Sequence, residues 1–477
     1  MVRFAVKRGM KVTRIAEGDL IRWYQSSGRK PLVVRGARQV GKSTLVRLVA
    51  QKLGLAMWEV NLERHQELGV VFASLDSTRI LQEIGLALNQ GGVGKGVGIL
   101  FLDEIQAIPA ALSALRYFHE EKPDLAVVAA GSLLEFALGS EPFSMPVGRI
   151  EYCWLGPMTF IEFLEAVGEY LLVETLKKYR LDEDFPMAAH ERLLPLLRMY
   201  FLVGGMPEAV ARFAESRDIV RARQVHSSIL ETYRDDFRKY AKRADLEKIW
   251  RIYEALPSNI GLKTRYNRFH PDWKASDIRR CLELLQRAGI VDMAVHTDGT
   301  GLPLGAAEDP TVTKLFHLDC GLVSTALGGA SIPIANFLSG RYINEGTFAE
   351  QVVAQLLLRT GSVNSRPQLH WWLRGGKSAN AEVDFITATG GKVLPIEVKS
   401  GSSGSLRSLH QFMLPHQGGI ALRLDLNPPS CQDLDLEVMT ASGKTRVCYS
   451  LVNLPLYLAE RIQGLIGEDR ASLGTEA

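Results

Sequence analysis

Short apolar runs, separated by stretches with helical periodicity, occupy the first third of the chain. Four of these runs predict buried strands, at Pro31–Arg35, Ala56–Asn61, Val97–Leu102 and Leu125–Ala130. Short buried strands that alternate with helices form parallel sheets whose two faces are both covered. We therefore expect an α/β fold in this part of the chain, with helices on both faces of a parallel sheet.

The pattern changes near residue 155, where helical periodicity replaces the alternation. From Pro157 to about Ala241 the apolar residues recur roughly every 3.6 positions, with one break at Gly204–Pro207. This segment is predicted to be mostly helical. Farther along, Ser276–Gly289 is predicted to be a helix, because Ser276 can cap its start and Gly289 can end it.

A hairpin is expected directly after that helix. Two predicted strands, Val291–Val295 and Lys314–Leu318, flank a glycine-containing loop at Asp298–Pro310. A helix followed by such a hairpin has the outline of a winged helix-turn-helix.

A second α/β pattern begins near residue 340. A helix is expected over Thr347–Leu358, three strands follow, and a further helix carries Leu406, Leu409 and Phe412. The strands are expected at Leu369–Arg374, Ala381–Ile386 and Val393–Lys399. The polar residues from Gly467 onward are predicted to form a frayed tail.

The composition narrows the classes of function. The 56 Lys and Arg residues nearly balance 53 Asp and Glu residues, so nucleic-acid binding would require a local basic patch. No apolar run reaches about 18 residues, so neither a transmembrane helix nor a membrane partner is expected. The five cysteines are scattered and form no CxxC pair, which is typical of a reducing compartment and predicts a cytoplasmic protein.

A phosphate-binding motif joins the first predicted strand to the helix after it. The sequence there is Gly-x-x-x-x-Gly-Lys-Ser, whose glycines let the backbone fold around phosphates with its N–H groups pointing inward. We expect Lys42 to reach the β- and γ-phosphates of ATP, and Ser43 to offer its hydroxyl to Mg²⁺. The residues expected to bind ATP or ADP here are Gly36, Ala37, Arg38, Gln39, Val40, Gly41, Lys42, Ser43 and Thr44.

Acidic residues follow the third predicted strand. Asp103 is expected to hold the hydrated Mg²⁺, and Glu104 to orient or deprotonate the attacking water. Ser132, at the end of the next strand, is a candidate contact to the γ-phosphate or the water. Arg149 is either a guanidinium that reaches a γ-phosphate of its own or a neighbouring subunit, or a surface arginine.

A second acidic group lies in the C-terminal strands. Glu397 and Lys399 are two residues apart and so face one side of a strand, and a hairpin partner can bring Asp384 beside them. The carboxylates of Asp384 and Glu397 are candidate Mg²⁺ ligands, Glu350 could supply a third, and Lys399 could stabilise the charge of a phosphodiester under attack. The alternative is a solvated strand face on which apolar and charged residues alternate.

The predicted helix-turn-helix is locally basic. Residues 263–287 contain seven Lys or Arg and three Asp or Glu, a local charge of +4. Such a segment suits contact with DNA phosphates, and the alternative is a solvated helix face.

Together these motifs resemble one family, the bacterial and archaeal AAA-plus ATPases with a C-terminal restriction-endonuclease-like domain of unknown function. The resemblance is carried by the following residues: Gly-Ala-Arg-Gln-Val-Gly-Lys-Ser at 36–43, Leu-Asp-Glu-Ile-Gln at 102–106, Ala-Gly-Ser at 130–132, Gly-Arg at 148–149, residues 155–164, Gly-Gly-Met-Pro-Glu at 204–208, Glu-Val-Asp-Phe at 382–385 and Ile-Glu-Val-Lys-Ser-Gly at 396–401. One departure is that the helix after Lys399 lacks a Gln-x-x-x-Tyr pattern.

The resemblance implies five parts. They are an ATPase core over 1–155, a helical lid over 156–243, a winged helix over 244–335, a nuclease-like α/β domain over 336–465 and a tail over 466–477. It implies Mg²⁺-dependent ATP hydrolysis coupled to DNA through residues 263–287 and the C-terminal domain. It leaves open whether that domain cuts DNA or serves a non-cleaving nucleotide-gated switch that binds DNA or protein, and whether the core assembles a homo-oligomer.

Overall fold

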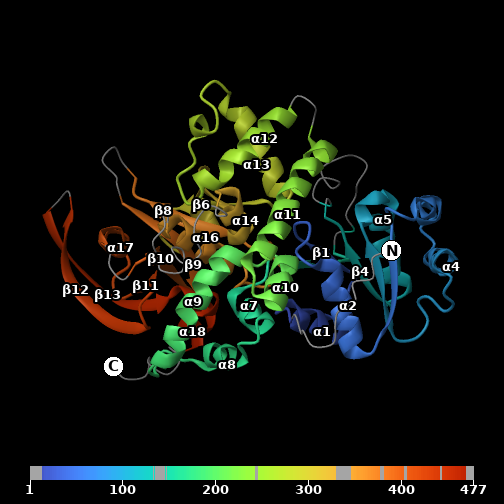
Figure 1. Ribbon diagram of the computed structural model, residues 1–477, viewed down its shortest axis with the longest axis horizontal. Coiled ribbons are helices and arrows are strands. Elements are labelled where there is room, and N and C mark those ends of the chain that lie inside the picture. Colours follow the sequence, from blue (N-terminus) through green and yellow to red (C-terminus); the bar gives the residue numbers. More distant parts are fainter. Residues whose placement is uncertain are drawn as a thin grey trace.

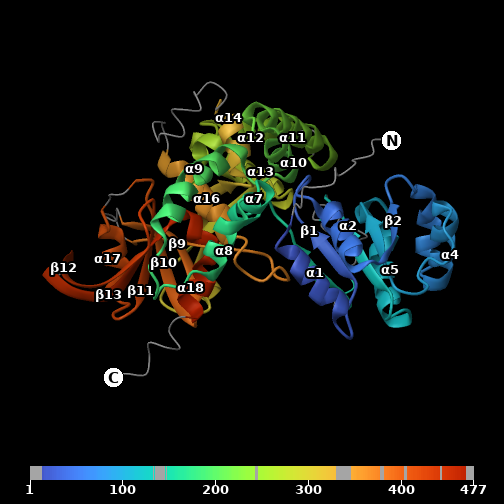
Figure 2. The same ribbon diagram turned by 60° about the horizontal axis from the view of Figure 1, so that its bottom comes forward.

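The computed structural model of the chain describes residues 13–132, 134, 146, 148–241, 245–328, 345–375, 381–401, 405–440 and 443–468. Two sheets lie at opposite ends of the molecule, with helices between them (Figures 1 and 2). No helix in these ranges is long and apolar enough to cross a membrane.

Five parallel strands form the first sheet, in the order β2-β3-β4-β1-β5. Four of them confirm the predicted strands to within a residue or two, and β5 was not predicted. Their bounds are β1 Leu32–Arg35, β2 Ala56–Asn61, β3 Gly98–Asp103, β4 Ala126–Ala130 and β5 Glu151–Trp154. Because all strands run the same way, their carboxyl ends meet at one edge, which is where the phosphate-binding loop lies.

Both faces of this sheet are covered, as expected. Alternate residues of β3 enter different cores, since side chains two apart share a face: Ile99 and Phe101 pack on one side, Leu100 and Leu102 on the other. The first side is covered by α1 Ala16–Gln25 and α2 Lys42–Leu53. The second is covered by α3 Gly69–Ala73, α4 Ser77–Leu88 and α5 Pro109–Glu121.

The predicted helical segment is helical in the structure. It contains α7 Phe160–Ala166, α8 Tyr170–Lys178, α9 Met187–Val203, α10 Pro207–Ser216 and α11 Ile219–Tyr240. Helix α7 begins at a capping box, in which the Thr159 hydroxyl accepts from the Glu162 amide and the Glu162 carboxylate accepts from the Thr159 amide.

The predicted helix and hairpin are also present. The segment contains α12 Leu246–Ala255, α13 Ala275–Arg287, β6 Val291–Thr297 and β7 Glu308–His317, the two strands pairing antiparallel. The prediction that Ser276 caps α13 is wrong: the cap position is Lys274, and Ser276 lies in the first turn. Gly289 does follow the helix end, with a left-handed φ of 72°.

The hairpin joins the C-terminal strands in one eight-stranded sheet, in the order β12-β13-β11-β10-β9-β8-β6-β7. Strand β6 pairs in parallel with β8. The division expected between residues 335 and 336 therefore runs through a single sheet. The remaining strands are β8 Leu369–Leu373, β9 Glu382–Thr389, β10 Lys392–Val398, β11 Ile420–Asp425, β12 Ser430–Thr440 and β13 Gly443–Pro455.

Helices α14 Cys320–Ala326, α16 Glu345–Leu357, α17 Arg407–Met413 and α18 Ile462–Glu468 complete this half. The three strands β11, β12 and β13 were not predicted, and α18 crosses the boundary expected at residue 466. One hydrophobic core runs from Val34 of β1 through Phe237 of α11 to Ile396 of β10. Short 3₁₀ segments lie at Gln66–Leu68, Ile105–Ala107, Leu256–Asn259, Tyr266–Arg268, Leu304–Ala307 and Leu456–Arg461.

Candidate functional site

Two glycines shape the loop between β1 and α2. Gly36 has a φ of 143°, and a Cβ there would lie 2.1 Å from the carbonyl oxygen of Leu155. Gly41 has a φ of 93° and caps the start of α2. Only glycine adopts these conformations without strain, and the turn directs backbone N–H groups and the positive end of α2 towards one point.

Lys42 is held inside this loop. Its ammonium donates to the carbonyl oxygens of Gly36 at 3.0 Å and Ala37 at 2.8 Å. Burial lowers the pKa of Lys42 to about 8, against the opposing effect of the Glu104 and Asp103 carboxylates. A phosphate beside this ammonium would stabilise its charged form.

Ser43 and Asp103 come together as the motifs predict. The Ser43 hydroxyl lies 3.1 Å from Asp103 Oδ2, at the carboxyl end of β3. Burial and the neighbouring Glu104 raise the pKa of Asp103. A hydroxyl and a carboxylate in contact suit a hard cation such as Mg²⁺, because Mg²⁺ is bound through one or two oxygen side chains together with substrate phosphates.

Glu104 has a left-handed backbone, with a φ of 52°. Its carboxylate accepts from Gln106 Nε2 at 2.6 Å and from the Ser132 hydroxyl at 3.4 Å. Gln106 was not singled out as a site residue. Its place two residues after Glu104, across the turn that follows β3, was the available signal.

Arg38 ties the loop to both β4 and α11. Its Nε lies 3.0 Å from the Ser132 hydroxyl and 3.0 Å from Asp236 Oδ2, and its carbonyl oxygen accepts from the Tyr233 hydroxyl at 2.8 Å. The α11 residues Tyr233 and Asp236 were not predicted. They lie about 200 positions along the chain from the loop, and no local pattern marks them.

Arg14 is a second unpredicted anchor. It is buried, and its guanidinium donates to the carbonyl oxygens of Val40 at 2.8 Å and Gly156 at 2.7 Å, while Nε pairs with Glu162 at 3.2 Å. The loop is thus fastened to the start of the helical segment as well as to α11.

Arg149 lies away from this site. Glu151, two residues later, pairs with Leu32 at the start of β1, so the length of β1, about 13 Å, separates Arg149 from the loop. Its Nε instead contacts Glu120 at 2.9 Å. The expectation that Arg149 reaches a γ-phosphate of its own subunit is wrong, because Arg149 lies near the amino ends of the strands and the phosphate-binding loop lies at their carboxyl ends. Contact with a neighbouring subunit stays a prediction.

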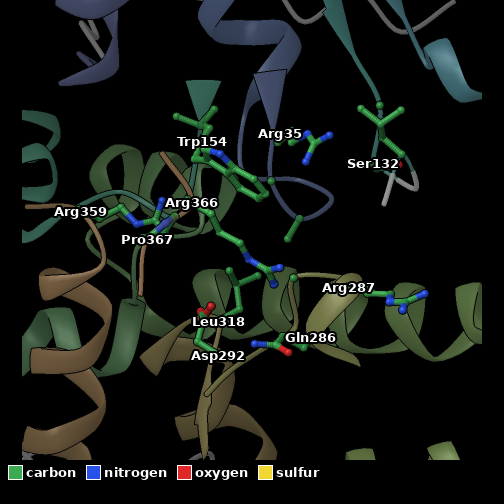
Figure 3. A pocket seen from close by; sticks show the side chains of 17 residues that line it. Arg35, Ser132, Trp154, Gln286, Arg287, Asp292, Leu318, Arg359, Arg366 and Pro367 are labelled. Carbon is green, nitrogen blue, oxygen red and sulfur yellow. The ribbon is translucent and has the colours of Figure 1, made fainter. Parts of the chain in front are cut away.

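A pocket opens beside the loop (Figure 3), lined by Gly36, Ala37 and Ser132 on the side of the first sheet. Four arginines line it, Arg35, Arg287, Arg359 and Arg366, with Asp292 as the acidic residue among them. In Figure 3 the guanidinium of Arg366 lies between Trp154 and Gln286. Arg287 and Gln286 belong to α13. The last turn of this helix therefore faces the phosphate-binding loop.

The second acidic group forms as a cluster, with two unpredicted members, Lys314 and Glu382. The Lys314 ammonium lies 3.4 Å from Glu382 Oε1, 3.5 Å from Asp384 Oδ1 and 3.7 Å from Glu350 Oε2. Lys399 Nζ contacts Glu397 Oε1 at 2.5 Å, and Asp384 Oδ2 accepts from the Val398 amide at 2.8 Å. Burial and the neighbouring Asp384 raise the pKa of Glu350 to about 8 and that of Glu397 to about 7.

The cluster does not offer a ready metal site. Within the described ranges, no three His, Cys, Asp or Glu side chains are arranged to hold a metal ion. Glu350 Oε2 and Glu397 Oε2 are buried without a hydrogen-bond partner, so the donor chemistry would suit a cation. The space among Glu350, Glu382 and Asp384 is taken by the Lys314 ammonium. The expected ligands Glu350, Asp384 and Glu397 therefore come close together without forming a metal-binding arrangement.

Family comparison decides what the first sheet is. Residues 28–164, which contain the loop, Asp103 and Glu104, match the AAA domain family. This part of the chain is a P-loop ATPase domain of the AAA type. Residues 194–331 match a domain of unknown function, DUF8612, and residues 345–421 match another, DUF4143. No curated protein matches the chain.

Solved structures similar to the chain resemble it only distantly. The Walker-type ATPase PABY2304 of Pyrococcus abyssi has 16% identity and a TM-score of 0.40, over 66% of this chain and 96% of its own. The Orc1 protein of Aeropyrum pernix in complex with DNA has 15% identity and a TM-score of 0.25, over 66% and 90%. The RuvB Holliday junction branch migration motor of Thermotoga maritima has 16% identity and a TM-score of 0.27, over 58% of this chain and 87% of its own.

The basic segment of the chain, residues 263–287, divides into two parts. On α13, Arg279 pairs with Glu283 at 3.0 Å, and Arg280 pairs with Asp245 at 2.6 Å. Before the helix, four basic residues are exposed, and none forms an ion pair with any residue that the structure describes. These four residues, Lys263, Arg265, Arg268 and Lys274, are called the basic patch below.

Proposed function

We propose that this ATPase hydrolyses ATP with Mg²⁺ and that the occupancy of the nucleotide site controls DNA binding at the basic patch. The observation that carries the proposal is that α13 is shared by both sites. Its last turn faces the phosphate-binding loop through Arg287, and the chain just before its first turn carries the patch.

The nucleotide site contains the groups that this chemistry needs. Mg²⁺, when bound, neutralises phosphate charge and would be held by the Ser43 hydroxyl and Asp103. Lys42 would bind the β- and γ-phosphates. Glu104 would accept a proton from the attacking water or orient it, with Gln106 and Ser132 holding the carboxylate in place.

Two features connect this site to the rest of the chain. Arg38 donates a hydrogen bond to Ser132, the candidate contact to the γ-phosphate, and forms an ion pair with Asp236 of α11. Gly289, directly after α13, lies so close to Ala37 that a Cβ on it would be 3.2 Å from the Ala37 Cβ. Loss of the γ-phosphate would therefore change contacts on which both α11 and α13 rest.

The basic patch suits the phosphates of a nucleic-acid backbone, because its charges are exposed and form no ion pair with the residues that the structure describes. In solution the patch should give a salt-dependent, largely sequence-independent affinity. We expect duplex DNA to change the rate of ATP hydrolysis, and each nucleotide state to have its own DNA affinity.

The test compares two triple variants that each remove three positive charges. Lys263→Ala/Arg265→Ala/Arg268→Ala should weaken DNA binding about tenfold or more, lower the salt slope by about 3 and abolish the effect of DNA on hydrolysis. Lys177→Ala/Lys178→Ala/Arg180→Ala, on exposed residues at the end of α8 and just after it, is the matched control and should change none of these. An equal loss of DNA binding in both variants, or a rate of ATP hydrolysis that DNA does not change, would refute the coupling.

A second candidate function is a switch that binds DNA without cutting it. The presence of Lys314 within the acidic cluster favours this candidate over a metal-dependent nuclease. Helix α17 supports it too, because His410 bonds to Tyr449 and Gln411 to Met439 rather than to the cluster.

A further inference from the structure

The most unusual side chain in the C-terminal half is Lys314. It lies on β7 and is 0% exposed, although lysine is almost never fully buried without a partner. Its neighbour across the ladder is Ala294 of β6, whose small side chain leaves room along the sheet face. The Lys314 side chain extends across β8, with Nζ 5.0 Å from the centre of the Trp371 ring.

The ammonium ends among carboxylates from two separate elements. Glu382 and Asp384 come from β9, and Glu350 comes from α16. An ammonium is a compact charge with three donors, and here it meets three acceptors at 3.4 to 3.7 Å. These carboxylates also raise the pKa of Lys314 above its ordinary value, so the group stays charged at neutral pH.

We propose that the Lys314 ammonium is the resident cation of this cluster and takes the place that a divalent metal would occupy. The cluster is therefore a metal-independent structural site, and the C-terminal half does not cleave DNA by a metal-dependent route. This inference does not depend on the proposed coupling of ATP and DNA.

Charge explains why metal and ammonium exclude each other. Both ammonium groups already contact the acidic side chains of the cluster, Lys314 at 3.4 to 3.7 Å and Lys399 at 2.5 Å. A divalent ion placed beside Asp384 would lie within a few ångströms of a buried positive charge, where repulsion is weakly screened. Removing the ammonium would instead leave buried carboxylates without compensation and open a space lined by oxygens.

The cluster also joins two matched families. Lys314 lies within the region of DUF8612, and Glu350, Asp384 and Glu397 lie within DUF4143. The ion pairs consequently fasten the hairpin of β6 and β7 to the strands after it. This gives the buried charges a structural role that needs no catalysis.

The experiment measures thermal unfolding of the full chain, without nucleotide, with and without millimolar Mn²⁺. The unfolding temperature of the wild type should not change when Mn²⁺ is added. Lys314→Met, which keeps the length and removes the charge, should unfold at a lower temperature and recover about 2–5 °C when Mn²⁺ is added. Lys314→Met/Asp384→Asn should not recover, which separates this site from metal binding at Ser43 and Asp103.

Two further measurements keep the inference open to refutation if Lys314→Met does not fold. Lys314→Arg retains the charge and should fold and remain indifferent to Mn²⁺. The inference is overturned if wild-type protein is stabilised by Mn²⁺ in a manner lost in Asp384→Asn, or if wild type nicks plasmid with Mn²⁺ and Asp384→Asn does not. All of these variants should hydrolyse ATP as wild type does, so failure here is distinct from failure of the ATPase proposal.

Discussion

At the scale of single residues, the nucleotide site is defined by how burial changes charge. Lys42 is a buried ammonium whose only hydrogen bonds within the described residues go to two backbone carbonyls. These acceptors are neutral, so desolvation prevails and the pKa falls to about 8. A triphosphate would reverse this balance, because its charge stabilises the ammonium.

This balance predicts that ATP binding depends on pH. Below about pH 8 Lys42 is already protonated, and affinity should be constant. Above pH 8 binding must be accompanied by proton uptake, so affinity should fall by up to about tenfold per pH unit. Calorimetry in buffers of different ionisation enthalpy measures both quantities. Lys42→Arg, whose guanidinium does not titrate, should remove the slope, and a slope that persists in this variant would contradict the assignment.

At the scale of elements, helix α11 contacts the phosphate-binding loop through Arg38. Asp236 and Tyr233 lie one turn apart on its buried face, and both contact Arg38. The hydrogen bond from Arg38 to Ser132 places the same guanidinium beside the end of β4. We therefore expect a small shift of Arg38 on phosphate binding to be passed to this helix of 22 residues.

The matched pair Asp236→Asn and Asp235→Asn tests this contact. Asp236 is buried and pairs with Arg38, whereas its neighbour Asp235 is exposed. Asp236→Asn should leave ATP affinity within about threefold of wild type but reduce the effect of DNA on hydrolysis, because it removes the negative charge that pairs with Arg38. Asp235→Asn should behave as wild type. If DNA changed the steady-state ATPase rate equally in the two variants, coupling through the contact between Arg38 and Asp236 would be excluded.

At the scale of the whole molecule, one hydrophobic core includes residues of the first sheet, the helices and the second sheet, so these parts are not separately packed domains. Arg149 and Glu120 lie at the end of the first sheet away from the phosphate-binding loop. An arginine there cannot assist its own site, but it is free to assist the site of an adjacent copy.

This geometry predicts complementation between subunits. Arg149→Ala should bind ATP normally yet lose hydrolysis by about 10³-fold, if the arginine acts on a neighbour's nucleotide. Mixing it with Lys42→Ala should restore part of the activity, because one subunit supplies the phosphate-binding loop and the other supplies the arginine. Arg116→Ala, which removes the other partner of Glu120, is the control and should remain active. Absence of restoration together with a monomeric mass would refute the shared site.

Local patterns determined four of the five strands of the first sheet and the nucleotide motif, because strand periodicity, glycines and the acids after β3 act within a few residues of one another. Even the hairpin of β6 and β7 was visible in this way. The sequence pattern did not show that this hairpin belongs to the C-terminal sheet, because the pairing of β6 with β8 joins residues about 75 positions apart. Strands β12 and β13, which were also missed, have polar faces that give a weaker apolar pattern.

Tertiary structure alone decided which charges meet. Nothing near Lys314 in the chain marks it as the partner of Glu350, Glu382 and Asp384, and nothing near Asp236 marks it as the partner of Arg38. The spacing of Asp384, Glu397 and Lys399 correctly predicted proximity but not what lies among them. The physical reason is that a strand pattern specifies the face on which a side chain lies, whereas the electrostatics of a buried group depend on every charge that the fold brings within a few ångströms.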